Sequence, residues 1–266
     1  MTTTQWLMIG LTFAGVLASA VIFLRGRTAW AVAVLVAAAL AVNVFAATLD
    51  PFLHEWDERY HALVAKNMLD HPFKPVLRAD PVLPYDHRQW WDIHVWLHKQ
   101  PLFLWQIAAS FAVLGIHEWT LRLPMVLMTT LLVPVLFRMG VLIANATVGY
   151  AAAMLFPLAY YHSGGGFIYN DPDYRQRRIH NSRVYRRLGA VLSPKHVVMN
   201  VKPLEFVDVM FYSGLPAYDR LPTPEEHAML LDRGRLLAVF DDGDLPPFLA
   251  DDDRVTKLRM PEFELR

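Results

Sequence analysis

The chain has 266 residues, of which 55% are hydrophobic, and its mean hydropathy is +0.25. This composition indicates a protein that is partly embedded in a membrane and partly soluble. Basic and acidic residues number 25 each, so the formal net charge is zero and gives no global attraction for nucleic acid. Cysteine is absent, which excludes disulfides and thiolate metal sites.

Two uncharged apolar runs begin the chain, at residues 6–24 and 28–48. Each has about the ~20 residues that a helix needs to cross ~30 Å of hydrocarbon. Arg25-Gly26-Arg27 joins them, and a short basic loop of this kind stays in the cytoplasm. No basic segment precedes the first run, so it does not fit a cleavable signal. We expect a transmembrane hairpin over residues 1–48, after which the chain emerges outside the cytoplasm.

A polar segment rich in acidic and aromatic residues follows, and we expect residues 49–122 to form an extracytoplasmic loop with interfacial helices. Asp57 and Glu58 are predicted to open a helix that runs to Leu69, because the helix dipole favours carboxylates at its start. The spacing of the apolar residues predicts that its buried side carries Tyr60, Leu63, Val64 and Met68.

Three apolar runs come next. Residues 100–116 are few for a crossing, and we expect an interfacial or re-entrant helix there. Residues 123–137 and 139–161 are expected to cross as a second hairpin, with Arg138 near their junction as a cytoplasmic anchor. This hairpin is placed at residues 123–163.

The composition changes at Ser163-Gly164-Gly165-Gly166, and a basic stretch follows. Residues 164–266 have the pattern of a small soluble α/β domain. Buried strands are expected at 196–201, 206–212, 236–240 and, as a short last strand, 255–260. Thr223, Pro224 and Glu226 predict a capped helix that ends near Gly234.

The expected fold is therefore an α-helical membrane protein with a small C-terminal α/β soluble domain. Four crossings would put the loop at 49–100 and the C-terminal domain on the same, extracytoplasmic side. If residues 100–116 also crossed, the C-terminal domain would be cytoplasmic. We expect a multi-pass protein of the inner (cytoplasmic) membrane.

Asp57 and Glu58 are candidates for acid–base chemistry as well as for helix capping. A carboxylate here could deprotonate an acceptor hydroxyl or amine as a general base. Adjacent helical residues point about 100° apart, so the two side chains would not share one role. We assign the catalytic role to Asp57 and a supporting role to Glu58; capping alone is the alternative.

Lys99 lies at the membrane-proximal end of the loop. It is either an anchor that extends its ammonium group to the interface or a ligand whose charge neutralises a leaving lipid phosphate. The same substrate- or carrier-phosphate-binding role is assigned to His98, Arg78, Arg88 and Tyr60. Three tryptophans of the loop either stack on a sugar or form an aromatic belt at the interface: Trp90, Trp91 and Trp96.

The sequence gives little support for a metal site. His61, His94 and His98 are too scattered to argue for one, and the His-Glu-x-x-His spacing does not occur. The acidic runs at 241–244 and 251–253 lack the twelve-residue calcium loop, so we expect solvated turns. We assign no metal ligands, although a divalent cation stays open as a cofactor. Arg122 is expected to pair with Glu118 in a structural role.

Three motifs occur in order along the chain. They are Trp-Asp-Glu-Arg-Tyr at 56–60, His-Lys-Gln-Pro-Leu at 98–102, and Glu-Trp at 118–119 followed by Arg-Leu-Pro at 122–124. Together they resemble the membrane glycosyltransferases of family 39, which include protein mannosyltransferases and aminoarabinose transferases and have the GT-C fold. The resemblance covers residues 45–165. Residues 180–266 are also similar to the C-terminal periplasmic part of some bacterial members.

The resemblance implies inverting transfer of a hexosyl or pentosyl group from a polyprenyl-phosphate carrier to an extracytoplasmic lipid, glycan or protein. The family's acid motif falls on Asp57 and Glu58, and its phosphate-binding lysine falls on Lys99. Gln100 departs from the more usual proline. The implied partners are the polyprenyl-phosphate-linked sugar and the lipid bilayer, with no nucleic acid.

The chain departs from this family in length. Family members continue through more spans and a second acidic motif, whereas here the resemblance stops near Gly165 and resumes in the C-terminal domain. The chain therefore resembles an internally deleted member. One alternative is a catalytically inactive, membrane-anchored binding module. A transporter fragment is a weaker one, because the later runs hold Arg122 and Arg138 but no acidic residue within a span.

Overall fold

The computed structural model describes residues 3–85, 88–89, 93–162, 172–259 and 263–265. It divides into two compact units, each built from two stretches of the chain. The helical unit comprises Met1–Pro51 and His117–Arg175. The mixed unit comprises Phe52–Ile116 and Gln176–Arg266.

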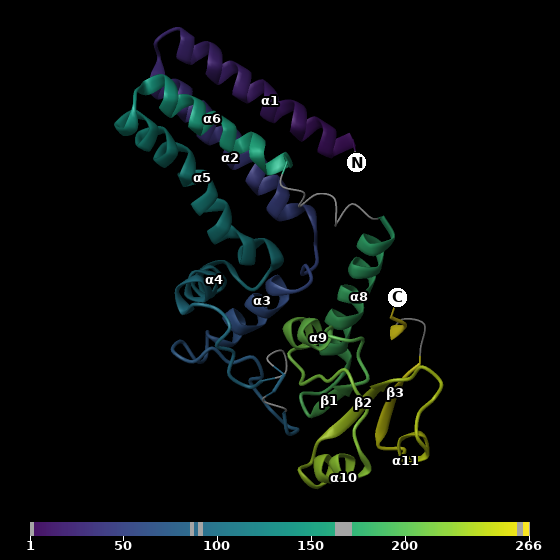
Figure 1. Cartoon of the computed structure of the whole chain (residues 1–266). Coiled ribbons are helices and arrows are strands. Elements are labelled where there is room, and N and C mark those ends of the chain that lie inside the picture. The colour runs from purple at the N-terminus through teal and green to yellow at the C-terminus, as the bar shows by residue number, and fades with distance from the viewer. Residues whose placement is uncertain (1–2, 86–87, 90–92, 163–171, 260–262, 266) are drawn as a thin grey trace. The chain divides into compact units, whose positions relative to one another are not determined.

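The described residues of the helical unit form mainly α1 (Thr3–Leu24), α2 (Thr28–Leu49), α5 (Glu118–Ile143) and α6 (Ala146–His162). In Figure 1, α1 lies along α2, and α6 lies beside α2 and α5. Three of these helices are long and apolar enough to cross a membrane, whereas the described part of α6 counts as a shorter apolar helix. The prediction of a helical membrane protein is therefore confirmed.

Close helix approach and one buried hydroxyl hold this unit together. A Cβ atom added to Gly140 of α5 would lie 2.4 Å from the Cα of Gly149 in α6, so the two backbones touch where neither has a side chain. The Ser19 hydroxyl of α1 lies 2.7 Å from the Ala31 carbonyl of α2 and 2.8 Å from the Tyr150 hydroxyl of α6. These bonds connect three helices without leaving their polar atoms unsatisfied in an apolar interior.

The predicted helix break near Arg138 is wrong, because α5 continues past this residue to Ile143. The chain turns at Asn145 instead, where the side-chain oxygen Oδ1 accepts hydrogen bonds from the backbone N–H groups of Thr147 and Val148. An asparagine in this position caps the following helix. The cap, and not the arginine, therefore decides where the turn lies.

The mixed unit contains a parallel sheet with the strand order β1 (His196–Met199), β2 (Leu236–Phe240) and β3 (Val255–Leu258). Parallel neighbours need crossover connections, which here carry short helices. These are α9 (Phe206–Ser213) and α10 (Pro224–Asp232) between β1 and β2, and α11 (Pro247–Ala250) between β2 and β3. The long helix α8 (Pro172–Val191) precedes the sheet.

Strands were predicted correctly at β1, β2 and β3, but the segment at 206–212 is a helix. Its first six residues are all buried, and periodicity cannot separate a helix from a strand in such a run. The segment ends at Gly214, whose φ of 74° is typical of a helix C-terminus. The predicted capping box of α10 is present, since Thr223 and Glu226 each accept a hydrogen bond from the other's backbone N–H.

The first loop contributes two helices to the mixed unit, α3 (Asp57–Asn67) and α4 (Pro101–Leu114). The predicted helix start at Asp57 is confirmed, and the four residues expected on its buried side are buried. Residues 100–116 do form a helix, whose interfacial position stays a prediction. The loop also supplies Val82 and Leu83 to the apolar core around the sheet.

A buried charge cluster joins α3, α8 and α9. The Arg178 guanidinium of α8 lies 2.8 Å from Asp208 Oδ1 and 3.1 Å from Glu205 Oε1. Arg59 Nη1 of α3 lies 3.4 Å from the other Asp208 oxygen and donates a 2.8 Å hydrogen bond to the Leu204 carbonyl. Burial raises the pKa of Asp208, and the two arginines oppose this effect. Two cations thus balance two carboxylates inside the unit.

Replacing Arg178 by Met should destabilise the mixed unit by about 3–5 kcal/mol, because Asp208 and Glu205 would lose their shared partner while Asp208 stays buried. The measurement is the free energy of unfolding of the detergent-solubilised chain in denaturant. Arg183→Met is the matched control, since Arg183 is exposed on the same helix. Equal unfolding free energies for the two variants would contradict a stabilising role for the cluster.

Candidate functional site

Asp57 and Lys99 meet in an ion pair within the mixed unit. Asp57 is the first residue of α3, and Lys99 lies two residues before α4. Lys99 Nζ donates a hydrogen bond of 2.8 Å to Asp57 Oδ2. The side chains are 36% and 55% exposed, so both remain accessible. The structure therefore brings together the acidic side chain and the basic side chain that the sequence singled out.

The lysine sets the ionisation of the acid. The hydrogen bond from Lys99 holds the pKa of Asp57 below its usual value, and partial burial opposes this only in part. Asp57 is thus a carboxylate at neutral pH, as a proton acceptor must be. While it is paired it is also a weak base, since a lowered pKa means a lower proton affinity.

His61 belongs to the same site, although the sequence analysis did not select it. It lies one helical turn after Asp57, on the same face of α3. Its ring is buried and makes edge contacts with Trp96 and Phe103. Burial lowers the pKa of His61 to about 4, so the ring is neutral at pH 7. Its Nε2 atom is buried and makes no hydrogen bond to any described residue. The i, i+4 spacing from Asp57 was the signal that could have identified it.

Glu58 and Tyr60 have structural contacts beside the pair. Glu58 Oε1 accepts a 3.1 Å hydrogen bond from the His54 backbone N–H, which holds the turn before α3. The Tyr60 ring stacks on Trp96 with their centroids 5.9 Å apart, and burial raises the pKa of Tyr60 to about 12. His98 is exposed, and its ring contacts the same tryptophan. Tyr60 and His98 therefore share Trp96 as a packing partner, and Glu58 holds the turn that precedes Asp57.

Two other predicted ligands lie elsewhere in the loop. Arg78 is 2% exposed, and its Nη1 atom donates a 2.8 Å hydrogen bond to the Ala217 carbonyl. Its guanidinium also stacks over the rings of Phe206 and Tyr218. Arg78 is thus an interior residue that holds the loop against α9. Arg88 is exposed on the loop.

The three predicted tryptophans do not act as a set. Trp96 is fully buried, so it neither stacks on a sugar nor contributes to an aromatic belt. Trp90 and Trp91 lie outside the described residues.

Arg122 has a structural role in the helical unit, as expected. Its Nη1 atom donates hydrogen bonds of 3.0 Å to the Ala47 carbonyl and 2.8 Å to the Asp50 carbonyl. A cation at these carbonyls stabilises the C-terminal end of α2. The structural role was expected, the structure adds the end of α2 as a partner, and the pairing with Glu118 stays a prediction.

The described ranges contain no group of three histidine or acidic residues that could hold a metal ion. The pair itself offers one carboxylate and one ammonium group. Its chemistry is therefore that of a proton acceptor beside a fixed positive charge.

Comparison with known proteins finds a similarity to membrane glycosyltransferases in one part of the chain. The family model described as dolichyl-phosphate-mannose-protein mannosyltransferase matches residues 98–174. No curated protein and no solved structure matches the chain. The matched segment includes Lys99, α4, α5 and α6, whereas Asp57 lies outside it. The chain is thus a membrane protein with a segment similar to mannosyltransferases.

The low pKa of His61 predicts acid sensitivity of the mixed unit. The ordinary histidine pKa is 6.5 and the folded value is about 4. Between these values the unfolded chain binds a proton that the folded chain does not, so stability should fall as the pH drops through this window. His61→Phe should remove part of that loss. The measurement is the thermal unfolding midpoint at pH 7 and at pH 5.

His71→Phe is the control for this experiment, because His71 is exposed. An identical pH dependence in wild type and His61→Phe would show that the buried ring does not cause the acid sensitivity.

Proposed function

We propose that the chain is a glycosyltransferase that moves a sugar from a polyprenyl-phosphate carrier to an acceptor on the extracytoplasmic face, and that Asp57 and Lys99 form its reaction site. The observation that carries this proposal is their 2.8 Å ion pair, made by residues from separate parts of the loop. The similarity of residues 98–174 to mannosyltransferases supports the class of reaction and the type of donor.

Lys99 is the proposed ligand of the carrier phosphate. When the bond from the sugar to the phosphate breaks, the leaving phosphate gains negative charge, which a fixed cation stabilises. Lys99 also lies just before the N-terminus of the apolar helix α4, where free backbone N–H groups favour an anion. A phosphate next to an apolar helix matches a lipid carrier, whose chain needs an apolar surface.

Asp57 is the proposed general base. In the resting pair its pKa is low because Lys99 donates to it. A carrier phosphate that takes over the hydrogen bonds of Lys99 would raise this pKa and so strengthen the base. The acceptor hydroxyl would then give its proton to Asp57 while its oxygen forms a bond to the anomeric carbon of the sugar. The carbon–oxygen bond to the phosphate breaks, and its electron pair leaves with the carrier.

This scheme links the arrival of the donor to the activation of the base. A single displacement at the anomeric carbon inverts its configuration, in agreement with the inverting transfer that the family resemblance implies. Glu58 would support the site by holding the turn before α3 through His54. His61 would keep one side of the carboxylate free of bulk water.

We also propose that the chain is a shortened member of glycosyltransferase family 39, with a GT-C-like arrangement of spans in the inner membrane. The proposed internal deletion lies near Gly165, where the resemblance stops, and the matched segment ends close by at residue 174. The basic loop between α1 and α2 supports a cytoplasmic turn there and an extracytoplasmic first loop. Sequencing of the locus tests the deletion. A longer reading frame that contains the further spans would show that this chain is a shortened form.

Asp57→Asn should reduce sugar transfer by a factor of about 10²–10⁴, the range expected for the loss of a general base. The assay follows labelled sugar from polyprenyl-phosphate donors into membrane acceptors, using the full chain in proteoliposomes. Asp70→Asn is the control, because Asp70 is exposed beyond the end of α3. Full activity in Asp57→Asn would overturn its assignment as the base.

Lys99→Gln should act mainly on the donor. We expect a raised KM for the polyprenyl-phosphate sugar, because the neutral side chain no longer attracts the phosphate, together with a lower kcat from the lost stabilisation of the leaving group. Lys99→Arg should recover part of the activity. The same steady-state assay measures both parameters, and an unchanged KM and kcat in Lys99→Gln would exclude a phosphate contact.

A further inference from the structure

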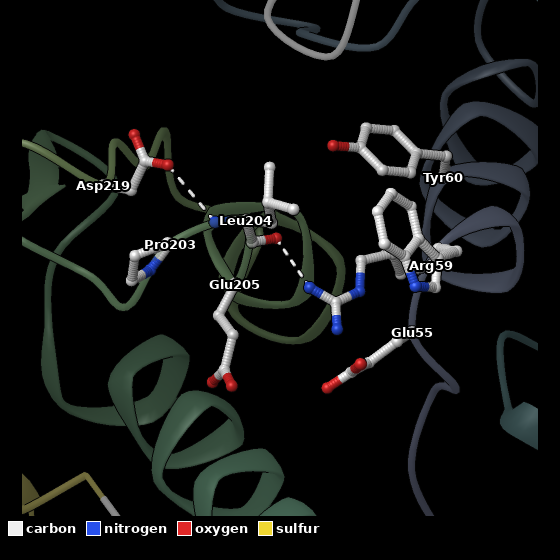
Figure 2. Close-up of a pocket in the computed structure, with 8 residues that line it drawn as sticks. Glu55, Arg59, Tyr60, Pro203, Leu204, Glu205 and Asp219 are labelled. Atoms are coloured by element: carbon white, nitrogen blue, oxygen red, sulfur yellow. Dashed lines mark hydrogen bonds between the residues drawn. The ribbon is translucent and has the colours of Figure 1, made fainter. Parts of the chain in front are cut away.

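A cleft of about 550 Å³ lies within the mixed unit, beside the start of α3. Its volume is typical of a small-molecule site, for which the range is ~300–1,000 Å³. Figure 2 shows one side of this cleft formed by Asp219, Leu204 and Glu205, and the other side formed by Glu55, Arg59 and Tyr60. Asp57 and Lys99 are not among its lining residues. The reaction scheme proposed above gives no role to the residues of this cleft.

Two acidic groups of the cleft are available to a ligand. Glu55 and Asp219 are exposed, and neither is paired with a cation in the described part of the chain. Asp219 accepts one hydrogen bond of 3.2 Å through Oδ2, from the Leu204 backbone N–H. The Glu205 carboxylate differs, because Arg178 and Asn181 already donate to its two oxygens. Glu205 therefore only lines the cleft, whereas the other two carboxylates can accept hydrogen bonds from a ligand.

Arg59 supplies donors to the same space. Its side chain is 4% exposed, and Nη1 is engaged by the Leu204 carbonyl and by Asp208. Nε is buried without a hydrogen bond, and Nη2 has no hydrogen bond or ion pair with any described residue. A buried guanidinium with unused N–H groups gains free energy when a ligand oxygen accepts from it. The cleft thus combines acceptors and a donor.

Aromatic side chains complete the lining. Trp56 is 66% exposed and Tyr60 is buried, and both contribute to the cleft. The backbone is strained at the same place, since Trp56 and Leu204 each have a φ of 62°. Such a conformation costs on the order of 1–3 kcal/mol for a bulky residue and persists where the surroundings fix it. An exposed indole held in this way is an available apolar surface.

The combination of groups selects the ligand. A simple cation would be repelled by Arg59, and a simple anion would be repelled by Glu55 and Asp219. An apolar ligand would bury those carboxylates without partners. A sugar ring has hydroxyl donors for the carboxylates, oxygen acceptors for the arginine and a C–H face for an aromatic ring. We infer that this cleft is a binding subsite for one sugar ring of the acceptor.

The position of the cleft relates it to the reaction site, so this inference rests on the proposed function. Arg59 follows Asp57 by two residues on α3, which places the two side chains roughly 200° apart around the helix. The Arg59 wall of the cleft and the ion pair therefore lie on opposite flanks of one helix turn, whose diameter is ~10–12 Å with side chains. An acceptor that reaches both must be longer than one sugar ring, so the acceptor is an oligosaccharide or carries one.

Sugar binding can be measured without transfer. The full chain in detergent is titrated with mannotriose, maltotriose and chitotriose by calorimetry. At least one trisaccharide should bind the wild type, and Asp219→Ala and Trp56→Ala should each weaken that binding about tenfold or more, as expected for loss of a contact to a charged group or an aromatic ring. Asp253→Ala is the matched control, because Asp253 is exposed in a turn of the same unit and does not line the cleft.

The outcomes separate this inference from the proposed function. No binding of any of the three sugars to the wild type, or equal binding to wild type and both cleft variants, would overturn the subsite. Binding that depends on Asp219 and Trp56 supports it even if the wild type transfers no sugar, a result that would overturn the proposed activity alone. Where transfer occurs, Asp219→Ala should raise the KM for the acceptor more than it lowers kcat.

Discussion

The mixed unit depends on the buried contact between Arg178 and the carboxylates of Asp208 and Glu205. Charges inside a protein are costly unless they are paired, so a cluster with two arginines and two acids tolerates little displacement of any member. Arg59 belongs to this cluster and also to α3. The start of α3 is therefore fixed against α8 and α9 by electrostatics as well as by apolar packing. Everything that projects from that start, on either flank, takes its position from the cluster.

Two aspartates of this unit illustrate how environment divides chemical roles. Asp208 is buried, desolvation raises its pKa, and its carboxylate is held by Arg178 and Arg59 inside the unit. Asp57 is 55% exposed, and its pKa is lowered by the ammonium group of Lys99. Only the second can exchange its partner with an incoming ligand, because only the second is reached by solvent. The exposed carboxylate at the start of α3 and the buried carboxylate of α9 are thus held in opposite environments.

The sequence predicted those parts of the fold that depend on local rules. Charge-free runs predicted the first hairpin, and the acidic pair predicted the start of α3. Ordered motifs favoured Asp57 and Lys99, which the structure brings into one ion pair, and their shared role stays a prediction. The strand predicted at 206–212 was wrong, because complete burial removes the periodic signal. The helix break predicted near Arg138 was also wrong, because the turn lies at the Asn145 cap. Buried positions of polar residues also escaped prediction, as for His61 and Arg78, because tertiary contacts from distant segments create them.

The division of the chain into interleaved stretches has a consequence for biogenesis. The first loop is synthesised early, yet its packing partners in α8, α9 and the sheet follow the whole of α5 and α6. Helices α5 and α6 are sequence neighbours that can pair through a short turn as soon as both have left the ribosome, whereas the loop must wait for residues far downstream. During synthesis Arg59 therefore lacks Asp208 until the part of the chain that follows α5 and α6 has been made. The buried cluster that holds Arg59 is therefore among the last features of this protein to form.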